Sequence, residues 1–278
     1  MRIAVGIEYD GSRYRGWQRQ ASAPSVQGEV ERALAFVADH PVEVTCAGRT
    51  DAGVHALVQV AHFDTSAERS PRGWVLGANT RLPHDMAILW AAAVAPGFHA
   101  RYSALSRSYR YLIHNRLSRP ALMRRRVCWV HEPLDEVAMH AAAQMLVGEH
   151  DFSAFRAAEC QSRTPLRRIE RLEVSRSGEC VALRVTANAF LHHMVRNIAG
   201  TLIAVGRGER PARWVREVLE SRDRRAAGHT ADAGGLYLEG VAYPADAGVQ
   251  MELEHCGNSD ADRGSLCKPL FFDHGHGG

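Results

Sequence analysis

Segments with the two-residue period of β-strands recur along most of this chain. Residues 2–9 alternate, and Ile3, Val5, Ile7 and Tyr9 share one face, as in a half-buried strand. Strand-like composition is also found in the segments 42–46, 58–63, 86–94, 109–113, 169–175, 181–186 and 236–243. Because each such strand must bury an apolar face, the fold has to be built around sheet.

Helical segments are predicted between the strands. Ser25 is a good N-cap for a helix that runs to about His40. The other predicted helices are 74–79, 134–147, 192–205 and 212–221. In the segment 134–147 we expect Val137, Ala141 and Met145 to face inward, since they lie four residues apart.

Strands and helices are mixed in two similar runs, which predicts an α+β fold. We expect two similar halves, each a mainly antiparallel sheet backed by helices, with the active-site cleft between them. The predicted divisions are an N-terminal half (1–104), a C-terminal half (105–245) and a poorly structured tail (246–278). The tail is rich in Gly and Asp and lacks periodicity before its apolar triplet at 270–272.

The charge distribution favours an anionic polymer as a partner. Residues 246–278 carry six acidic and two basic side chains, which leaves 32 basic and 25 acidic ones before them. Lys268 is the only lysine, so 33 of the 34 basic residues are arginine. Codon bias explains such a preference equally well, but guanidinium groups suit phosphates and stack on bases whatever its origin.

Other parts of the composition indicate a soluble, cytoplasmic protein without a metal. No apolar run is long enough to cross a bilayer, and the N-terminus lacks the apolar region of a signal peptide. The six cysteines are scattered without a CxxC pair, which fits a reducing compartment and gives no zinc-ligand spacing. Among the 15 histidines, His192 and His193 are adjacent, so on a helix we expect them to point in different directions.

The most informative segment is Cys46–Ala56, Cys-Ala-Gly-Arg-Thr-Asp-Ala-Gly-Val-His-Ala, which joins two predicted strands. An isolated Thr-Asp-Ala-Gly would be interpreted as a turn in which Asp51 accepts hydrogen bonds from nearby backbone N–H groups. The whole string, however, is similar to the catalytic motif of the TruA family of pseudouridine synthases. The resemblance extends over roughly residues 1–245, through the segments 6–11, 16–20, 25–27, 98–104, 109–111, 160–164, 188–197 and 235–238.

This resemblance implies a tRNA pseudouridine synthase, an isomerase (intramolecular transferase). The reaction breaks the N1–C1′ bond of uridine and joins C5 to the same sugar carbon. It gains no atoms and changes no oxidation state, so no cofactor is expected. Asp51 is then the essential carboxylate, acting either as a covalent nucleophile or as the base that gives a glycal. The implied substrate is the tRNA anticodon stem-loop, with uridines at positions 38, 39 and 40, and the implied assembly is a homodimer.

Four further site residues are implied by the resemblance. Arg196 orients Asp51 and keeps it charged, Tyr109 stacks on the target base and is a candidate for removing the C5 proton, and Leu236 packs against the uracil. Arg49 fills the space that the flipped uridine leaves or holds a phosphate. Taken alone, a residue such as Arg196 is usually a solvated helix arginine, and Tyr109 is equally well explained as a packing tyrosine. By pattern Leu236 is a strand core residue, and the alternative for Arg49 is a structural ion pair with some other carboxylate.

An RNA-binding surface is predicted in the segment 101–126, where arginines alternate with Tyr102, Tyr109 and Tyr111. These arginines are Arg101, Arg107, Arg110, Arg116, Arg119, Arg124, Arg125 and Arg126. Two alternatives stay open: an RNA-binding protein without catalysis, and a carboxylate-based glycoside or nucleoside hydrolase, which would need a second acid. The product separates them, since a hydrolase releases uracil and a binding protein changes nothing.

Overall fold

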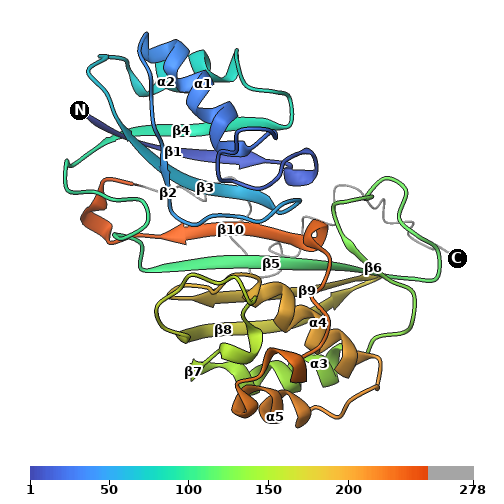
Figure 1. The fold of residues 1–278 in the computed structure, drawn as a ribbon. Helices are drawn as coiled ribbons and strands as arrows, with labels where there is room; N and C mark the ends of the chain where they lie inside the picture. Colours follow the sequence, from blue (N-terminus) through green and yellow to red (C-terminus); the bar gives the residue numbers. More distant parts are fainter. Residues whose placement is uncertain (250–278) are drawn as a thin grey trace, which may run out of the picture.

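The computed structural model describes residues 1–249, so most of the predicted tail lies outside the described residues. Within this range ten strands form one mixed sheet in the order β4-β1-β3-β10-β5-β9-β8-β7, with β2 beside β3 and β6 beside β5 (Figure 1). The strands are β1 (Arg2–Tyr9), β2 (Thr45–Cys46), β3 (His55–Asp64), β4 (Met86–Val94), β5 (Ser106–Asn115), β6 (Cys128–Val130), β7 (Gly148–Asp151), β8 (Leu166–Ser177), β9 (Cys180–Ala187) and β10 (Leu236–Ala242).

Most strands follow the predicted segments. The alternation in 2–9 becomes β1, which pairs antiparallel with both β3 and β4. Gly178 has φ 56° in the tight turn between β8 and β9, a backbone conformation that suits glycine. The first predicted strand after the helix is much shorter than expected, because only Thr45 and Cys46 of the segment 42–46 pair in the sheet.

The last strand joins the two runs into a single sheet. β10 lies between β3 and β5, parallel to the first and antiparallel to the second. An α+β fold is therefore confirmed, but its strands share one sheet and do not form two separate ones. The physical reason is that β3 and β5 would each expose an unpaired edge, which β10 covers with backbone hydrogen bonds.

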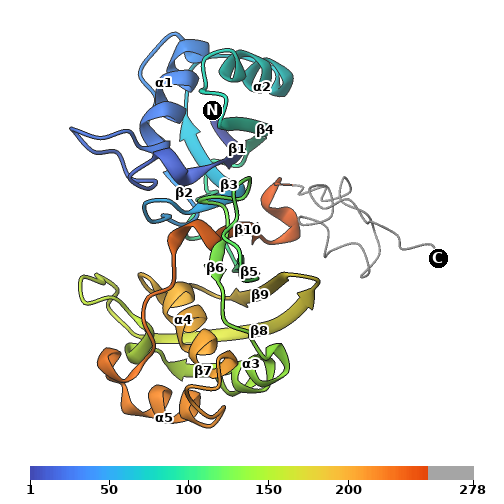
Figure 2. The same cartoon turned by 90° about the vertical axis from the view of Figure 1, so that its right-hand side faces the viewer.

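Helices lie at both ends of this sheet (Figures 1 and 2). At the β4 end, α1 (Val26–Ala38) packs on α2 (Pro71–Asn79). Toward the other end, α3 (Glu136–Ala143) packs on β8, α5 (Trp214–Ser221) contacts β7, and α4 (Met194–Gly206) lies over the strands nearer the middle and contacts β5. Ser25 caps α1 as predicted, since its hydroxyl oxygen accepts a hydrogen bond from the Gly28 N–H. Across residues 1–249, none of the helices has the length and apolar character needed to cross a membrane.

Two details of the predicted helices are wrong. In α3, Val137 is 72% exposed, whereas Met139 and Ala142 are fully buried, so the inward face is a different one. The helix that was expected to begin at His192 begins instead at Met194. The second difference decides the geometry of the candidate site.

Candidate active site

Hydrogen bonds to Thr50, one to its backbone and one to its side chain, hold the loop between β2 and β3 in place. The Trp17 N–H donates to the Thr50 carbonyl oxygen at 3.0 Å, and the Tyr9 and Thr50 hydroxyls share a 2.7 Å hydrogen bond. Gly16 approaches so closely that an added Cβ would lie 2.8 Å from the Thr50 oxygen, and its φ of 93° also favours glycine. These contacts fix the residue that follows, Asp51.

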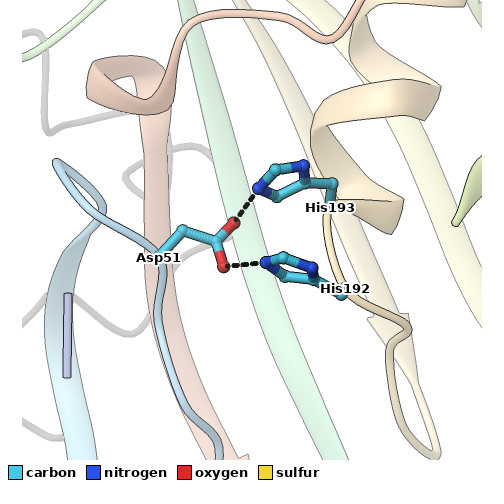
Figure 3. A group of neighbouring side chains, drawn as sticks. All are labelled: Asp51, His192 and His193. Atoms are coloured by element: carbon cyan, nitrogen blue, oxygen red, sulfur yellow. Dashed lines mark ion pairs between the residues drawn. The ribbon is translucent and has the colours of Figure 1, made fainter. Parts of the chain in front are cut away.

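Three basic side chains surround the Asp51 carboxylate, whose side chain is 22% exposed. His192 Nε2 lies 3.2 Å from Oδ1, and His193 Nε2 lies 3.3 Å from Oδ2 (Figure 3). Arg196 Nη1 lies 3.5 Å from Oδ2. The turn interpretation of Asp51 accounts for none of these contacts, since all three partners come from a distant part of the chain.

The two histidines point the same way because they precede α4. His193 is the N-cap residue and has φ 62°, a left-handed conformation, so neither ring follows helical geometry. Their ring centroids lie 4.0 Å apart, and both rings face Asp51. The expectation that they point in different directions is therefore wrong. Their place in the matched segment 188–197 was the one signal in the sequence that could have found them.

Arg196 lies in the first turn of α4, and its place beside Asp51 is as the resemblance implied. Its Nε donates to the Ala231 carbonyl oxygen at 2.9 Å, and the Ala231 N–H donates back to the Arg196 carbonyl oxygen at 3.1 Å. The guanidinium is thus held by one bond to the backbone and has Nη1 directed at the carboxylate.

Tyr109 is buried in β5, at 8% exposure. A Cβ added at Gly48 would lie 3.8 Å from its hydroxyl, so Tyr109 reaches the loop that carries Asp51. Burial and, to a smaller extent, the charge of Asp51 raise the pKa of the Tyr109 phenol well above its ordinary value. Phe190, which precedes the two histidines, covers the ring edge to face at a centroid distance of 4.9 Å.

Leu236 lies at the start of β10, 5% exposed and paired in register with Tyr111. Leu238 pairs with Tyr109, and residues two apart share a face, so Leu236 and Tyr109 lie on the same face of the sheet. Arg49 is exposed on the loop, two residues before Asp51. The structure thus brings Asp51, Arg196 and the two histidines into contact, whereas Tyr109 reaches the Asp51 loop at Gly48 and no direct contact links Leu236 or Arg49 to the carboxylate among the described residues.

The predicted arginine surface holds only in part. Arg107 and Arg110 are buried, the second beside Glu239, so neither is available to RNA. Arg116 pairs with Glu179. The exposed members are Arg101, Arg119, Arg124, Arg125 and Arg126, the last of them paired with Asp10. The sequence could not separate these groups, because arginine spacing says nothing about which side chain the sheet covers.

The buried Arg107 connects the segments that build the site. Its guanidinium donates to the carbonyl oxygens of Ala47, Ala104 and Asn188, and also to that of Arg101. Ala47 begins the loop of Asp51, and Asn188 begins the segment that leads to the histidines. Arg107 therefore ties both sides of the candidate site to β5.

Taken together, these contacts describe an α+β protein whose candidate active site is centred on one carboxylate. The chain belongs to the tRNA pseudouridine synthase family, whose model matches residues 6–103 and 142–244. It is 60% identical over 243 residues to tRNA pseudouridine synthase A of Coxiella burnetii, which covers 87% of this chain and 93% of that protein. The corresponding protein of Methylococcus capsulatus is 60% identical over 257 residues, 92% of this chain and 95% of its own.

A similar relationship holds for tRNA pseudouridine synthase A of Aeromonas hydrophila, which is 58% identical over 91% of this chain and 94% of that protein. Among solved structures, a Cbf5-Nop10-Gar1 complex matches 72% of this chain and 45% of that chain. Its TM-score of 0.37 and identity of 13% are too low to carry an argument.

Proposed function

We propose that this chain isomerises uridine to pseudouridine in the anticodon stem-loop of tRNA, at positions 38, 39 and 40, and that Asp51 is the essential carboxylate. Membership of the family makes the chain an isomerase acting on tRNA uridines. The observation that carries the assignment of Asp51 is its position between a guanidinium and two imidazoles, on a loop held by buried backbone contacts. A turn residue needs none of these partners.

The reaction requires the Asp51 carboxylate to be ionised and oriented toward the substrate. Whether its oxygen attacks the substrate or removes a ribose proton, the carboxylate must lose its own proton first. Arg196, whose Nη1 lies 3.5 Å from Oδ2, is the cationic side chain that orients this carboxylate. After the N1–C1′ bond breaks, C5 of the freed uracil bonds to C1′ and its proton must leave.

Tyr109 is our candidate for taking that proton. Because burial raises its pKa, the free enzyme holds Tyr109 as a neutral phenol. Tyr109 therefore takes the C5 proton only if its hydroxyl proton passes to a water molecule in the same step. Its ring is also covered by Phe190. We infer that the target uracil displaces Phe190, and that the base then stacks on Tyr109 and packs against Leu236.

We also propose that the uridine enters between two halves of the chain. Asp51 belongs to the first predicted half, whereas Tyr109, His193 and Arg196 belong to the second, and their contacts cross the division at 104–105. The uridine must leave its stack to reach this site, and Arg49 fills the space it leaves or holds the adjacent phosphate. The exposed arginines contact the RNA backbone. The enzyme acts as a homodimer, and the bound tRNA contacts both subunits.

The experiment that tests this function maps the modified uridines in tRNA incubated with the purified protein. The expected result is pseudouridine at positions 38, 39 and 40, and none when those uridines are replaced by cytidines. Release of free uracil would identify a hydrolase, and unchanged tRNA that is nevertheless bound would identify a binding protein. Pseudouridine at other positions would contradict the assigned substrate region.

A further inference from the structure

Asp51, His192 and His193 form a convergent set of potential metal ligands. Their ligand atoms all lie within 4.8 Å of one another, and Figure 3 shows both imidazoles directed at the carboxylate from the segment before α4. The isomerisation derived above uses Asp51 but assigns no step to either histidine. The contact of both histidines with Asp51 therefore has no explanation in the proposed reaction.

Two imidazole nitrogens and one carboxylate make a donor set that binds zinc and related divalent transition metals. His192 Nε2 faces Oδ1 at 3.2 Å and His193 Nε2 faces Oδ2 at 3.3 Å, so the two imidazoles approach the two oxygens of one carboxylate. With bonds of about 2.0–2.2 Å, one ion binds all three side chains after they draw closer together around it. Solvent reaches the set, because the His192 side chain is 38% exposed.

We propose that Asp51, His192 and His193 bind a divalent transition-metal ion, zinc above all, and that the bound ion inhibits the enzyme. The ion would take up both the charge and the lone pairs of the Asp51 carboxylate. A uridine could then meet neither a nucleophile nor a base. The inhibition rests on the proposed function of Asp51, whereas the binding does not.

Arg196 limits the strength of this site. Its Nη1 lies 3.5 Å from Oδ2, so a dication bound by the same carboxylate is repelled by a fixed positive charge. The three ligands also leave a fourth position to water or substrate, as in open zinc sites. We therefore expect reversible binding that a chelator removes. Magnesium should not bind, because it prefers oxygen ligands and the set supplies one carboxylate.

Metal binding is measured first without tRNA, on the full-length protein. Cobalt(II) serves as a spectroscopic probe, and competition by zinc gives the affinity. We expect the His192→Ala/His193→Ala variant to lose one metal equivalent, or to bind it at least about tenfold more weakly. His84→Ala, which removes an exposed histidine elsewhere, should keep the wild-type stoichiometry. Cysteines and histidines beyond residue 249 are present in every variant, so their contribution cancels.

Inhibition is measured next, with zinc added to a tritium-release assay at constant magnesium. Zinc should reduce turnover of the wild type and of His84→Ala alike, and excess EDTA should restore it. Equal metal stoichiometry and affinity in the wild type and the double variant would overturn the site. Binding at the site without any loss of turnover would overturn the inhibition. A wild type that is inactive before zinc is added would contradict the proposed function instead.

Discussion

Asp51 shows how much a single residue depends on its surroundings. The Trp17 N–H and the Tyr9 hydroxyl hold the preceding residue, Thr50, so the carboxylate leaves the loop in one direction. Burial keeps water from most of the side chain, and among residues 1–249 Arg196 is the partner of Asp51 whose charge is permanent. The chemistry proposed for this carboxylate is therefore testable by substitutions that keep its shape.

Asp51→Asn should abolish turnover while leaving the fold intact. The amide keeps the size of the carboxylate but is neither a competent nucleophile nor a base, so the loss should exceed the ~10²–10⁴-fold typical of one general acid–base group. Binding of tRNA should persist, because arginine–phosphate contacts dominate affinity. Tritium release from tRNA carrying 5-³H-uridine, measured beside a filter-binding titration, tests both. Residual activity above about a tenth of wild type would exclude a central role for Asp51.

Tyr109→Phe should separate stacking from proton transfer. The ring suffices to stack on uracil, whereas removal of the C5 proton needs the hydroxyl, so we expect near-normal tRNA affinity and a strongly reduced kcat. Tyr102→Phe is the matched control, because Tyr102 is 76% exposed and lies outside the contacts of Asp51. Wild-type kcat in the Tyr109 variant would assign the proton transfer to another group or to water.

At the scale of elements, β5 positions the site through a side chain that does not touch Asp51. Burial lowers the pKa of Arg107, and its guanidinium donates only to backbone carbonyl oxygens among the described residues. Two of these oxygens belong to Ala47 and Asn188, which lead into the loop of Asp51 and the segment of the histidines. Such an arginine acts as a positioning residue.

Arg107→Lys should lower both stability and turnover. Lysine keeps the positive charge but cannot reach all of the carbonyl oxygens, and each buried group left without a partner costs about 1–3 kcal/mol. We expect a lower free energy of unfolding in urea and a reduced kcat with little change in KM. Arg72→Lys, at an exposed position outside the predicted RNA-binding surface, should change neither quantity. A less stable variant with wild-type kcat would show that Arg107 supports the fold without positioning the site.

The whole molecule is organised by one sheet, in which β10 returns from the end of the described chain to lie between β3 and β5. This strand brings the Ala231 to Leu236 segment beside Arg196 and Tyr111, so both halves contribute to a single site. Two predictions concern the molecule as a whole, since they ask which parts of the chain and which added components the reaction needs.

Deleting residues 250–278 should leave folding and activity unchanged. The family match ends at residue 244, before the deleted segment begins. Ala247 and Val249 are kept because both pack against the core. Circular dichroism and the tritium-release assay check the outcome. A truncated protein that is folded but inactive would assign the tail a part in the mechanism.

Chelation with EDTA should not lower turnover of unmodified tRNA. The isomerisation is redox-neutral and transfers no group from outside, so the side chains of the site suffice for it. The measurement is the initial rate before and after chelation, with the tRNA fold checked independently by its melting curve. Loss of activity that one particular divalent ion restores, with the tRNA still folded, would contradict a metal-free reaction.

Local pattern was enough to predict much of this protein. Alternation predicted β1, capping by Ser25 predicted α1, and the eleven-residue motif around Asp51 predicted the family. These features depend on neighbours in the chain, through backbone conformation and the burial of one face. The α3 face was predicted wrongly because Val137 and Met139 are both apolar, and only the packing of α3 against β8 selects the second.

Only the tertiary structure decided what surrounds Asp51. His192 and His193 turn toward it because α4 begins at Met194, and that boundary follows from a left-handed residue which no propensity required. Arg107 was counted among the RNA-binding arginines, and the sheet buries it. The sequence determined which groups the site has available. Their positions depend on contacts between segments more than a hundred residues apart, which local conformational preference does not encode.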